Sequence, residues 1–347
     1  MTTPNKVFCC FDKIHYWHSR LCPPIGLIAN IGLIYLIIKK TPKEMKIHSR
    51  ILLQTCVIDI ALLIVTVFGQ PVLSFQPSGF CVMLFQGYFS FFLEEVPLIK
   101  IYIFAIWYFL NTLDVNGIAV QFLYRYLGLN CRITINILRY TYLATTPFIA
   151  SLLLAISWFF MVAKDQLNKQ NLDISYFSYF MDRESAENYI AVTYSFNSMD
   201  LVIYWSYSYQ ILQIICYVIV IFCGVKMIRF VHIHSSLTQK MKELNKQLII
   251  TLIILASFPL ILMSTNTFIS SVAPHFIDLN TESLLFMFQG LLSHWLPLLN
   301  PLASIYTMRP YREFLIQKVF KIKTKTQKVT PVTILVQQNS KYGNSKI

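Results

Sequence analysis

Long apolar stretches alternate with short polar segments along most of this chain. Seven of these stretches can cross the roughly 30 Å hydrocarbon core of a bilayer as helices. They lie at about residues 21–38, 51–75, 97–124, 140–163, 201–228, 248–272 and 284–307. The pattern therefore predicts an all-α membrane protein built as a seven-transmembrane helix bundle, covering residues 21–307.

Two segments between the predicted spans are harder to assign. The apolar run 80–93 has only 14 residues and stands just before Glu94 and Glu95, which makes it short for a span. We interpret it as an outer loop that dips into the membrane interface. An eighth span there would move everything before it to the opposite side. The long, mixed-charge segment 164–200 is expected to fold over the bundle mouth.

The stretch 97–127 carries a polar stripe inside an otherwise apolar helix. Its members are Trp107, Asn111, Asp114, Gln121 and Arg125. At about 100° per residue, their spacing places all five on one helical face. A carboxylate at bilayer mid-depth normally faces a bundle interior or a wet cavity. We therefore predict that this helix is central and surrounded by other helices.

Depth along the predicted helices brings four polar side chains to one level. Asp59 lies nine residues after Arg50, and Asp114 eleven before Arg125, which is about 14–16 Å at 1.5 Å per residue. The same arithmetic applies to a pair of asparagines on the first and last spans. The predicted buried polar cluster consists of Asn30, Asp59, Asp114 and Asn300.

Two close carboxylates cannot both stay ionised without a counter-charge. This predicted cluster is therefore either a structural hydrogen-bond hub or a protonation or cation site, with sodium at Asp59 and Asp114 as the candidate ion. Membrane proteins also bury satisfied polar groups for structural reasons, so the residues alone leave both alternatives open. No other cofactor is expected.

Charge decides the predicted orientation. The chain has a net charge of +13, yet only 13% of its residues are charged, well below the roughly 25% of soluble proteins. With the N-terminus outside, 22 of the 29 basic residues fall on the inner side, which the positive-inside rule favours. We expect an extracellular N-terminus (1–20), an interfacial amphipathic helix (308–322) and a disordered cytoplasmic tail (323–347).

Outer aromatic residues allow two interpretations. They form either an interfacial belt or the wall of a mostly apolar ligand pocket between spans 3, 5, 6 and 7. The predicted ligand-binding residues are Tyr108, Asn111, Tyr207, Gln210, Asn266 and His294.

The inner side carries the residues that we expect to act as a switch. Arg125 in Tyr124-Arg125-Tyr126 lies at the inner end of span 3, and Pro259 and Pro301 are bendable points in spans 6 and 7. Arg125 is either a membrane anchor or a functional group. The two prolines are either tolerated kinks or parts of a conformational switch.

Other classes of function find no support in the sequence. It has no H-E-x-x-H, G-x-S-x-G, G-x-G-x-x-G or P-loop motif, so we expect no enzyme. None of its eight cysteines forms a C-x-x-C pair, which makes a metal site unexpected. The basic residues lie between apolar runs without a recognition motif, which argues against nucleic acid.

Several short segments form a recognisable set: Tyr124-Arg125-Tyr126, Pro259, Asn300-Pro301, the Asn30 to Asp59 spacing, Lys39–Lys46, Ser49–Cys56 and Pro310-Tyr311-Arg312. Together they resemble those of nematode serpentine chemoreceptors, within the G-protein-coupled receptor superfamily. The serpentine receptor class delta is the most similar. The resemblance covers about residues 20–320. It implies a plasma-membrane receptor, in a sensory cilium as the narrower expectation, that binds a small odorant-like ligand and signals through a cytoplasmic heterotrimeric G protein.

The sequence departs from that family pattern in three places. Tyr124 replaces the usual acid before the arginine, and Tyr306 lies two places later than the usual tyrosine. Segment 164–200 has no cysteine, so the disulfide common in the superfamily cannot form there. A disulfide at Cys81 would need Cys9, Cys10 or Cys22 as its partner.

A ligand-gated channel or small-solute transporter is the alternative function, although no internal repeat or charged pore ring is visible in the sequence.

Overall fold

The computed structural model describes residues 11–41, 46–75, 80–85, 97–131, 133, 136–165, 190–195, 199–233, 239–271 and 275–319. Its helices are α1 (Phe11–Lys40), α2 (Lys46–Phe68), α3 (Pro97–Leu129), α4 (Ile137–Asp165), α6 (Met199–Ile233), α7 (Gln239–Ser271), α8 (Leu279–Ser293), α9 (Leu296–Thr307) and α10 (Arg309–Val319). Its strands are β1 (Pro71–Phe75), β2 (Phe80–Phe85) and β3 (Ile190–Ser195). The predicted N-terminal segment is only partly described, and the predicted tail lies outside these residues.

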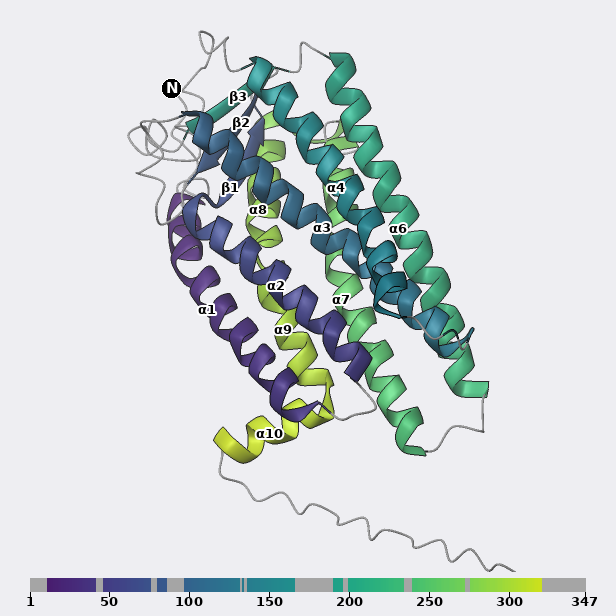
Figure 1. The fold of residues 1–347 in the computed structure, drawn as a ribbon. Helices are drawn as coiled ribbons and strands as arrows, with labels where there is room; N and C mark the ends of the chain where they lie inside the picture. The colour runs from purple at the N-terminus through teal and green to yellow at the C-terminus, as the bar shows by residue number, and fades with distance from the viewer. Residues whose placement is uncertain are drawn as a thin grey trace, which may run out of the picture.

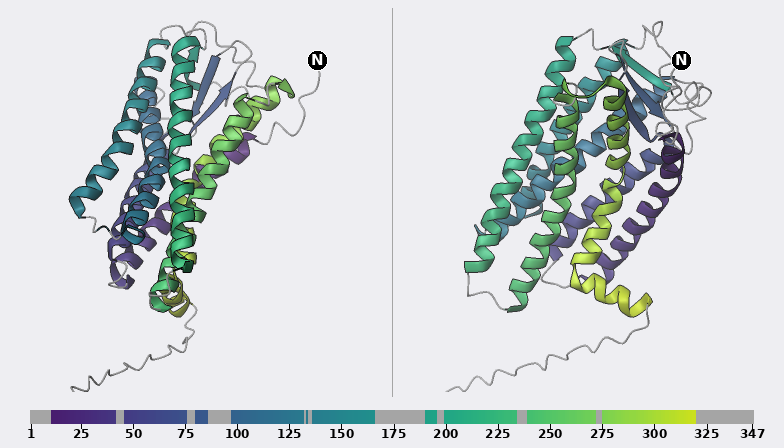
Figure 2. Two further views of the ribbon diagram at one scale, coloured as in Figure 1. Left: turned by 90° about the vertical axis from the view of Figure 1, so that its right-hand side faces the viewer. Right: turned by 180° about the vertical axis from the view of Figure 1, so that it is seen from behind.

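Helix α3 is the centre of the bundle, as its polar stripe predicted. It packs against α2, α4, α6 and α7, and it runs obliquely through the molecule (Figure 1). The view from behind in Figure 2 shows α7, α8 and α9 on the far side of the bundle from α4. Helix α1 lies at one edge, against α2 and α9.

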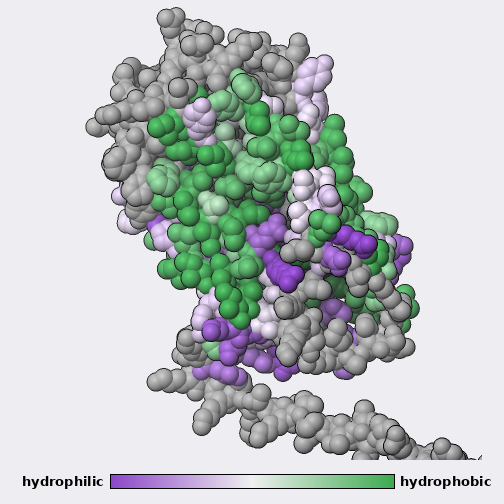
Figure 3. Space-filling model, viewed as in Figure 1, coloured by the Kyte–Doolittle hydropathy of each residue, from purple (hydrophilic) through white to green (hydrophobic). Residues whose placement is uncertain are grey.

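Six of the described helices are long and apolar enough to cross a membrane, judged by length and composition. These stretches are Lys13–Lys40, Ser49–Phe68, Ile99–Leu129, Leu138–Phe160, Tyr207–Ile233 and Asn245–Ile269. Figure 3 shows apolar side chains covering the middle of one face, with hydrophilic ones gathered toward the α10 end. The expectation of a helical membrane bundle is therefore confirmed in its coarse form.

The predicted span 284–307 is not one continuous helix. Helix α8 ends at Ser293 and α9 begins at Leu296, with His294 and Trp295 forming a turn between them. Pro297 in the first turn of α9 explains the break, because proline has no N–H to bond back to Ser293 and its ring clashes there. The last predicted span is thus assembled from two shorter helices.

A three-stranded antiparallel sheet, in the order β1-β2-β3, covers the end of the bundle opposite α10 (Figure 1). It corrects the all-α prediction and the span 51–75, because α2 ends at Phe68 and residues 71–75 pair with β2. Residues 80–85 form β2, and the rest of the predicted dipping loop lies outside the described residues. Residues 190–195 of the long segment 164–200 pair with β2 as β3.

Gly69 and Gln70 make the turn that ends α2. A Cβ at Gly69 would come within 2.9 Å of the Phe85 ring, so only glycine fits this close approach to β2. Gln70 follows with a φ of 43°, in the left-handed region that lets the chain reverse direction. The sheet is therefore set by a local turn rather than by a hydrophobic pattern.

Helix α10 turns away from α9 and lies across the end of the bundle (Figure 1). Tyr311 is buried and its hydroxyl lies 2.9 Å from that of Thr41, while the Lys40 ammonium stands 4.2 Å above the Phe314 ring. These contacts hold α10 against the end of α1. Residues 309–319 are helical within the predicted interfacial segment 308–322, whose last three residues lie outside the described ranges.

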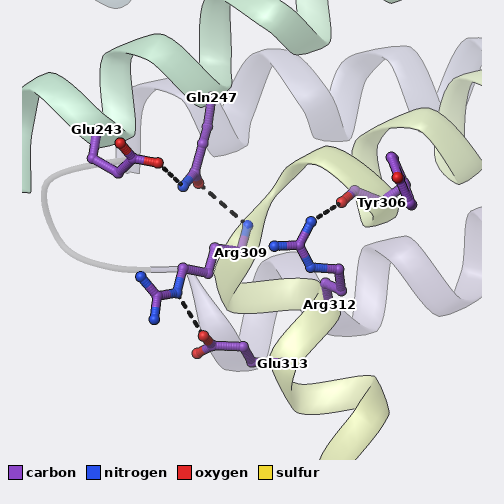
Figure 4. A network of polar contacts seen from close by, with 6 residues as sticks. All are labelled: Glu243, Gln247, Tyr306, Arg309, Arg312 and Glu313. Atoms are coloured by element: carbon purple, nitrogen blue, oxygen red, sulfur yellow. Dashed lines mark hydrogen bonds and ion pairs between the residues drawn. The ribbon is translucent and has the colours of Figure 1, made fainter. Parts of the chain in front are cut away.

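Figure 4 shows a second set of contacts, which joins α10 to α7 and α9. Gln247 of α7 donates to Glu243 at 3.1 Å and accepts from the Arg309 backbone N–H at 3.3 Å. Arg309 pairs with Glu313 at 2.6 Å, and this hydrogen bond raises the pKa of the guanidinium. Arg312 donates to the Tyr306 carbonyl at 2.9 Å. The pair is exposed, so these contacts orient α10 more than they stabilise it.

Candidate functional site

The polar cluster predicted from helix depth is present in its central part. The Asn300 amide nitrogen on α9 donates to Asp59 of α2 at 3.0 and 3.3 Å and to Asp114 of α3 at 3.4 Å. Asp59 is completely buried, and Asp114 and Asn300 nearly so. One amide group therefore joins three helices in the interior of the bundle, and we call these three residues the hub.

The hydrogen bonds define what the hub can hold. The amide nitrogen of Asn300 is a donor and points toward both carboxylates. In this orientation it donates hydrogen bonds to the acids and cannot coordinate a cation. A sodium ion would use the carboxylate oxygens, with the Asn300 amide turned to offer its oxygen. Among the described residues, no group of three or more histidine, cysteine or acidic side chains could hold a metal ion. The donor set fits a monovalent cation only after this rotation.

Asn30 is buried but is not a member of the hub, which corrects the predicted cluster of four. Its amide donates to the Pro297 carbonyl at 2.8 Å and to Gly26 at 3.0 Å. In a regular helix the N–H of residue 301 would bond to the carbonyl of Pro297, but Pro301 has none. Asn30 therefore satisfies a backbone acceptor that proline leaves open, and so ties α1 to α9.

Helix α3 has two polar faces, and the polar stripe described in the sequence is only one of them. On that face, Gln121 donates to the Thr55 hydroxyl of α2 at 3.0 Å, on the α10 side of the hub. On the other side of α3, Asn116 donates to Ser151 of α4 at 3.2 Å and accepts from Gln213 of α6 at 3.2 Å. Asn116 lies two residues from Asp114 and hence about 200° around the helix. A second polar position at that angle is the signal that could have predicted α4 and α6 as further neighbours.

Arg125 occupies the α10 end of α3 and is only partly buried. Its Nε is enclosed and has no hydrogen-bond partner in the described part of the chain. The buried Tyr124 ring meets Tyr140 of α4 edge-on at 5.2 Å, and the Tyr140 hydroxyl donates to the Gln54 side chain of α2. Pro259 and Pro301 are both buried inside their helices.

At the sheet end, His294 connects the α8–α9 break to three other elements. Its Nε2 lies 3.1 Å from the Pro71 carbonyl oxygen of β1, and because a carbonyl only accepts, this nitrogen donates. The centroid of its ring lies 5.3 Å from that of Trp107 of α3 and 6.1 Å from that of His18 of α1. His18 in turn accepts a 2.5 Å hydrogen bond from Gln70. The helix break thus presents an imidazole to β1, α1 and α3 at the sheet end of the bundle. His18 and Gln70 are neighbouring residues of this site that the sequence interpretation missed.

The predicted pocket residues do not all face one space. Tyr108 is buried, and the centroid of its ring lies 6.4 Å from that of Trp158 and 6.0 Å from that of Tyr209. Tyr207 is 61% exposed and does not point into the bundle, because it lies about 200° around α6 from the inward-facing Tyr209. The remaining members, Asn111, Gln210 and Asn266, are partly buried. Tyr209 therefore replaces Tyr207 on the inner face of α6.

Comparison with known proteins identifies a family whose model matches this chain. A family model described as "Serpentine type 7TM GPCR chemoreceptor Str" matches residues 16–316, which is most of the chain and includes the hub, the helix break and Arg125. The delta class predicted from the sequence is not confirmed by this match. No curated protein matches the chain.

Proposed function

The chain belongs to the Str family of serpentine 7TM GPCR chemoreceptors, and from this premise we propose that it is a receptor for a small, odorant-like ligand. The ligand binds in the half of the bundle near the sheet, which we take as the outer half. Binding is transmitted to a cytoplasmic heterotrimeric G protein at the α10 end. The protein acts in the plasma membrane, in a sensory cilium as the narrower proposal.

The observation that carries this proposal is the family match across residues 16–316. The geometry supports it, because the hub joins α2, α3 and α9 between the Trp107 and His294 rings toward the sheet and Arg125 toward α10. A ligand that prefers one arrangement of these helices shifts the population toward it. The helix break at His294 and Trp295 gives α9 freedom to move relative to α8.

Reporter cells test this function directly. The chain is expressed with a panel of G proteins and exposed to small volatile compounds, with calcium as the readout. We expect at least one compound to evoke a signal that disappears when the G protein is left out. Membrane current recorded in the same cells separates the receptor from the alternative of a ligand-gated channel or transporter. A ligand-evoked current that persists without any G protein would overturn the proposal.

The orientation is tested separately by epitope tags at the two chain ends. With the N-terminus outside and the C-terminus inside, only an N-terminal tag is stained on intact cells. Staining of both ends, or of neither, on intact cells contradicts the proposed sidedness. This result does not depend on a ligand.

Sodium binding at the hub is a further part of the proposal. The purified receptor is heated at increasing NaCl concentration, with choline chloride keeping the ionic strength constant. At ten times the dissociation constant, a bound ion stabilises the folded state by about 1.4 kcal/mol, so the unfolding temperature rises with sodium. Asp114→Asn is expected to remove the rise. An unfolding temperature that is independent of sodium in the unmodified protein eliminates the ion and leaves a hydrogen-bond hub alone.

A further inference from the structure

A crevice opens between α2 and α4, with α3 as its floor. Asp114, Gly117 and Gln121 line the floor, Thr55 is on the α2 side, and Tyr140 and Pro147 are on the α4 side. It lies in the half of the bundle toward α10, away from the proposed outer ligand pocket. In Figure 3, hydrophilic side chains interrupt the apolar surface between α2 and α4.

The crevice has an uneven distribution of polar groups. Aliphatic side chains such as Ile51, Ile58 and Ala144 line its walls beside polar ones, and Asp114 is the one acidic residue among the lining residues. The other hub acid, Asp59, does not line it and is completely buried. The two acids of the hub are therefore unequal, because only Asp114 borders a space that leads out of the bundle.

Gly117 leaves this space open. A Cβ added there would meet no atom within 4 Å, and the residue stands one turn from Asp114 on the floor of the crevice. The cavity volume is about 20 Å³, room for one water molecule or a group of that size. An acceptor at the end of a narrow apolar cleft fits a donor head group on a thin apolar tail.

We propose that this crevice is a lateral binding site, open to the membrane, for small linear amphiphiles whose hydroxyl or ammonium head hydrogen-bonds to Asp114. Such molecules partition into lipid and reach the carboxyl group from the side, without entering the outer half of the bundle. This inference does not rest on the proposed function, although Asp114 is also one of the two acids at the proposed sodium site.

A membrane-soluble carboxyl reagent tests the access route. N,N′-dicyclohexylcarbodiimide partitions into lipid and adds to a protonated carboxyl group, leaving a stable N-acylurea that retains all atoms of the reagent. The full chain in lipid nanodiscs is treated and digested, and the labelled peptides are quantified by mass spectrometry. We expect Asp114 to be labelled at least fivefold more than Asp59. Equal labelling of the two acids, or labelling of neither, overturns the proposal.

Matched glycine variants test the crevice itself. Gly117→Leu fills the space and is expected to reduce labelling of Asp114 at least fivefold. Gly32→Leu is the control, because a Cβ at Gly32 also meets nothing within 4 Å but lies on α1. If Gly117→Leu fails to fold, as judged by thermal unfolding, Gly117→Ala gives a smaller reduction. Labelling that is unchanged in the folded Gly117 variant, or equally reduced by Gly32→Leu, refutes the route.

Competition identifies the chemical class. Labelling is repeated with 1-octanol or with octane at equal membrane concentration. The alcohol is expected to protect Asp114 several-fold more than the alkane, because only the alcohol donates a hydrogen bond. Equal protection, or protection by neither compound, refutes the hydrogen-bonding head group.

Discussion

Asn300→Leu is expected to destabilise the bundle by about 2 kcal/mol, the cost of leaving buried polar groups without a donor. Asn300 is the shared donor to Asp59 and Asp114, at 3.0 and 3.4 Å, and leucine has a similar size but no N–H. For a chain of this length, the unfolding temperature should fall by about 3 °C. Thermal unfolding of the purified protein in detergent measures the effect.

A second substitution distinguishes this explanation from a simple packing defect. If unsatisfied acids cause the loss, adding Asp114→Asn to Asn300→Leu should recover at least half of the stability. The new amide removes one acid and can donate to Asp59, whereas a packing defect would not be repaired. Wild-type stability in the single variant would show that the hub contributes nothing to stability, whereas a destabilised single variant with no recovery in the double variant would assign the loss to packing.

Depth arithmetic was sufficient to predict the hub. Asp59, Asp114 and Asn300 lie nine to eleven residues from basic residues that mark the ends of their helices, and regular helices convert this spacing into a common level. It also predicted a central α3, because a helix that carries a carboxylate at mid-depth has to be surrounded. Regular helices and the bilayer together made these inferences reliable without any tertiary information.

Other parts of the structure depend on contacts that leave no periodic signal. Depth arithmetic also predicts Asn30 at this level, but its partner is the backbone carbonyl of Pro297, which no side-chain pattern reveals. The sheet depends on the Gly69–Gln70 turn and on pairing with residues 190–195, more than a hundred positions away. The outer aromatic pattern predicts Tyr207 in the pocket, but only the angle around α6 distinguishes it from Tyr209, which faces inward.

Arg125→Ala is expected to lower the potency of ligand-evoked signalling at least tenfold, without reducing the amount of receptor at the cell surface. Arg125 lies on the same face of α3 as Asp114, and its enclosed Nε has no partner among the described residues. The side chain as a whole is only partly buried, so its other N–H groups can reach a carbonyl or carboxylate of the bound G protein. A hydrogen bond to a charged group contributes about 1.5–3 kcal/mol, which corresponds to a tenfold effect or more.

Two further variants separate this role from a general loss of positive charge. Arg125→Lys retains the charge but not the planar fork of donors, so it should recover only part of the signal. Arg229→Gln removes an exposed basic residue near the same end of α6 and should change potency less than threefold. Surface staining of each variant normalises the calcium response. Full signalling by Arg125→Ala at normal surface density would instead assign Arg125 to membrane anchoring, because an anchor can be lost without affecting the bound G protein.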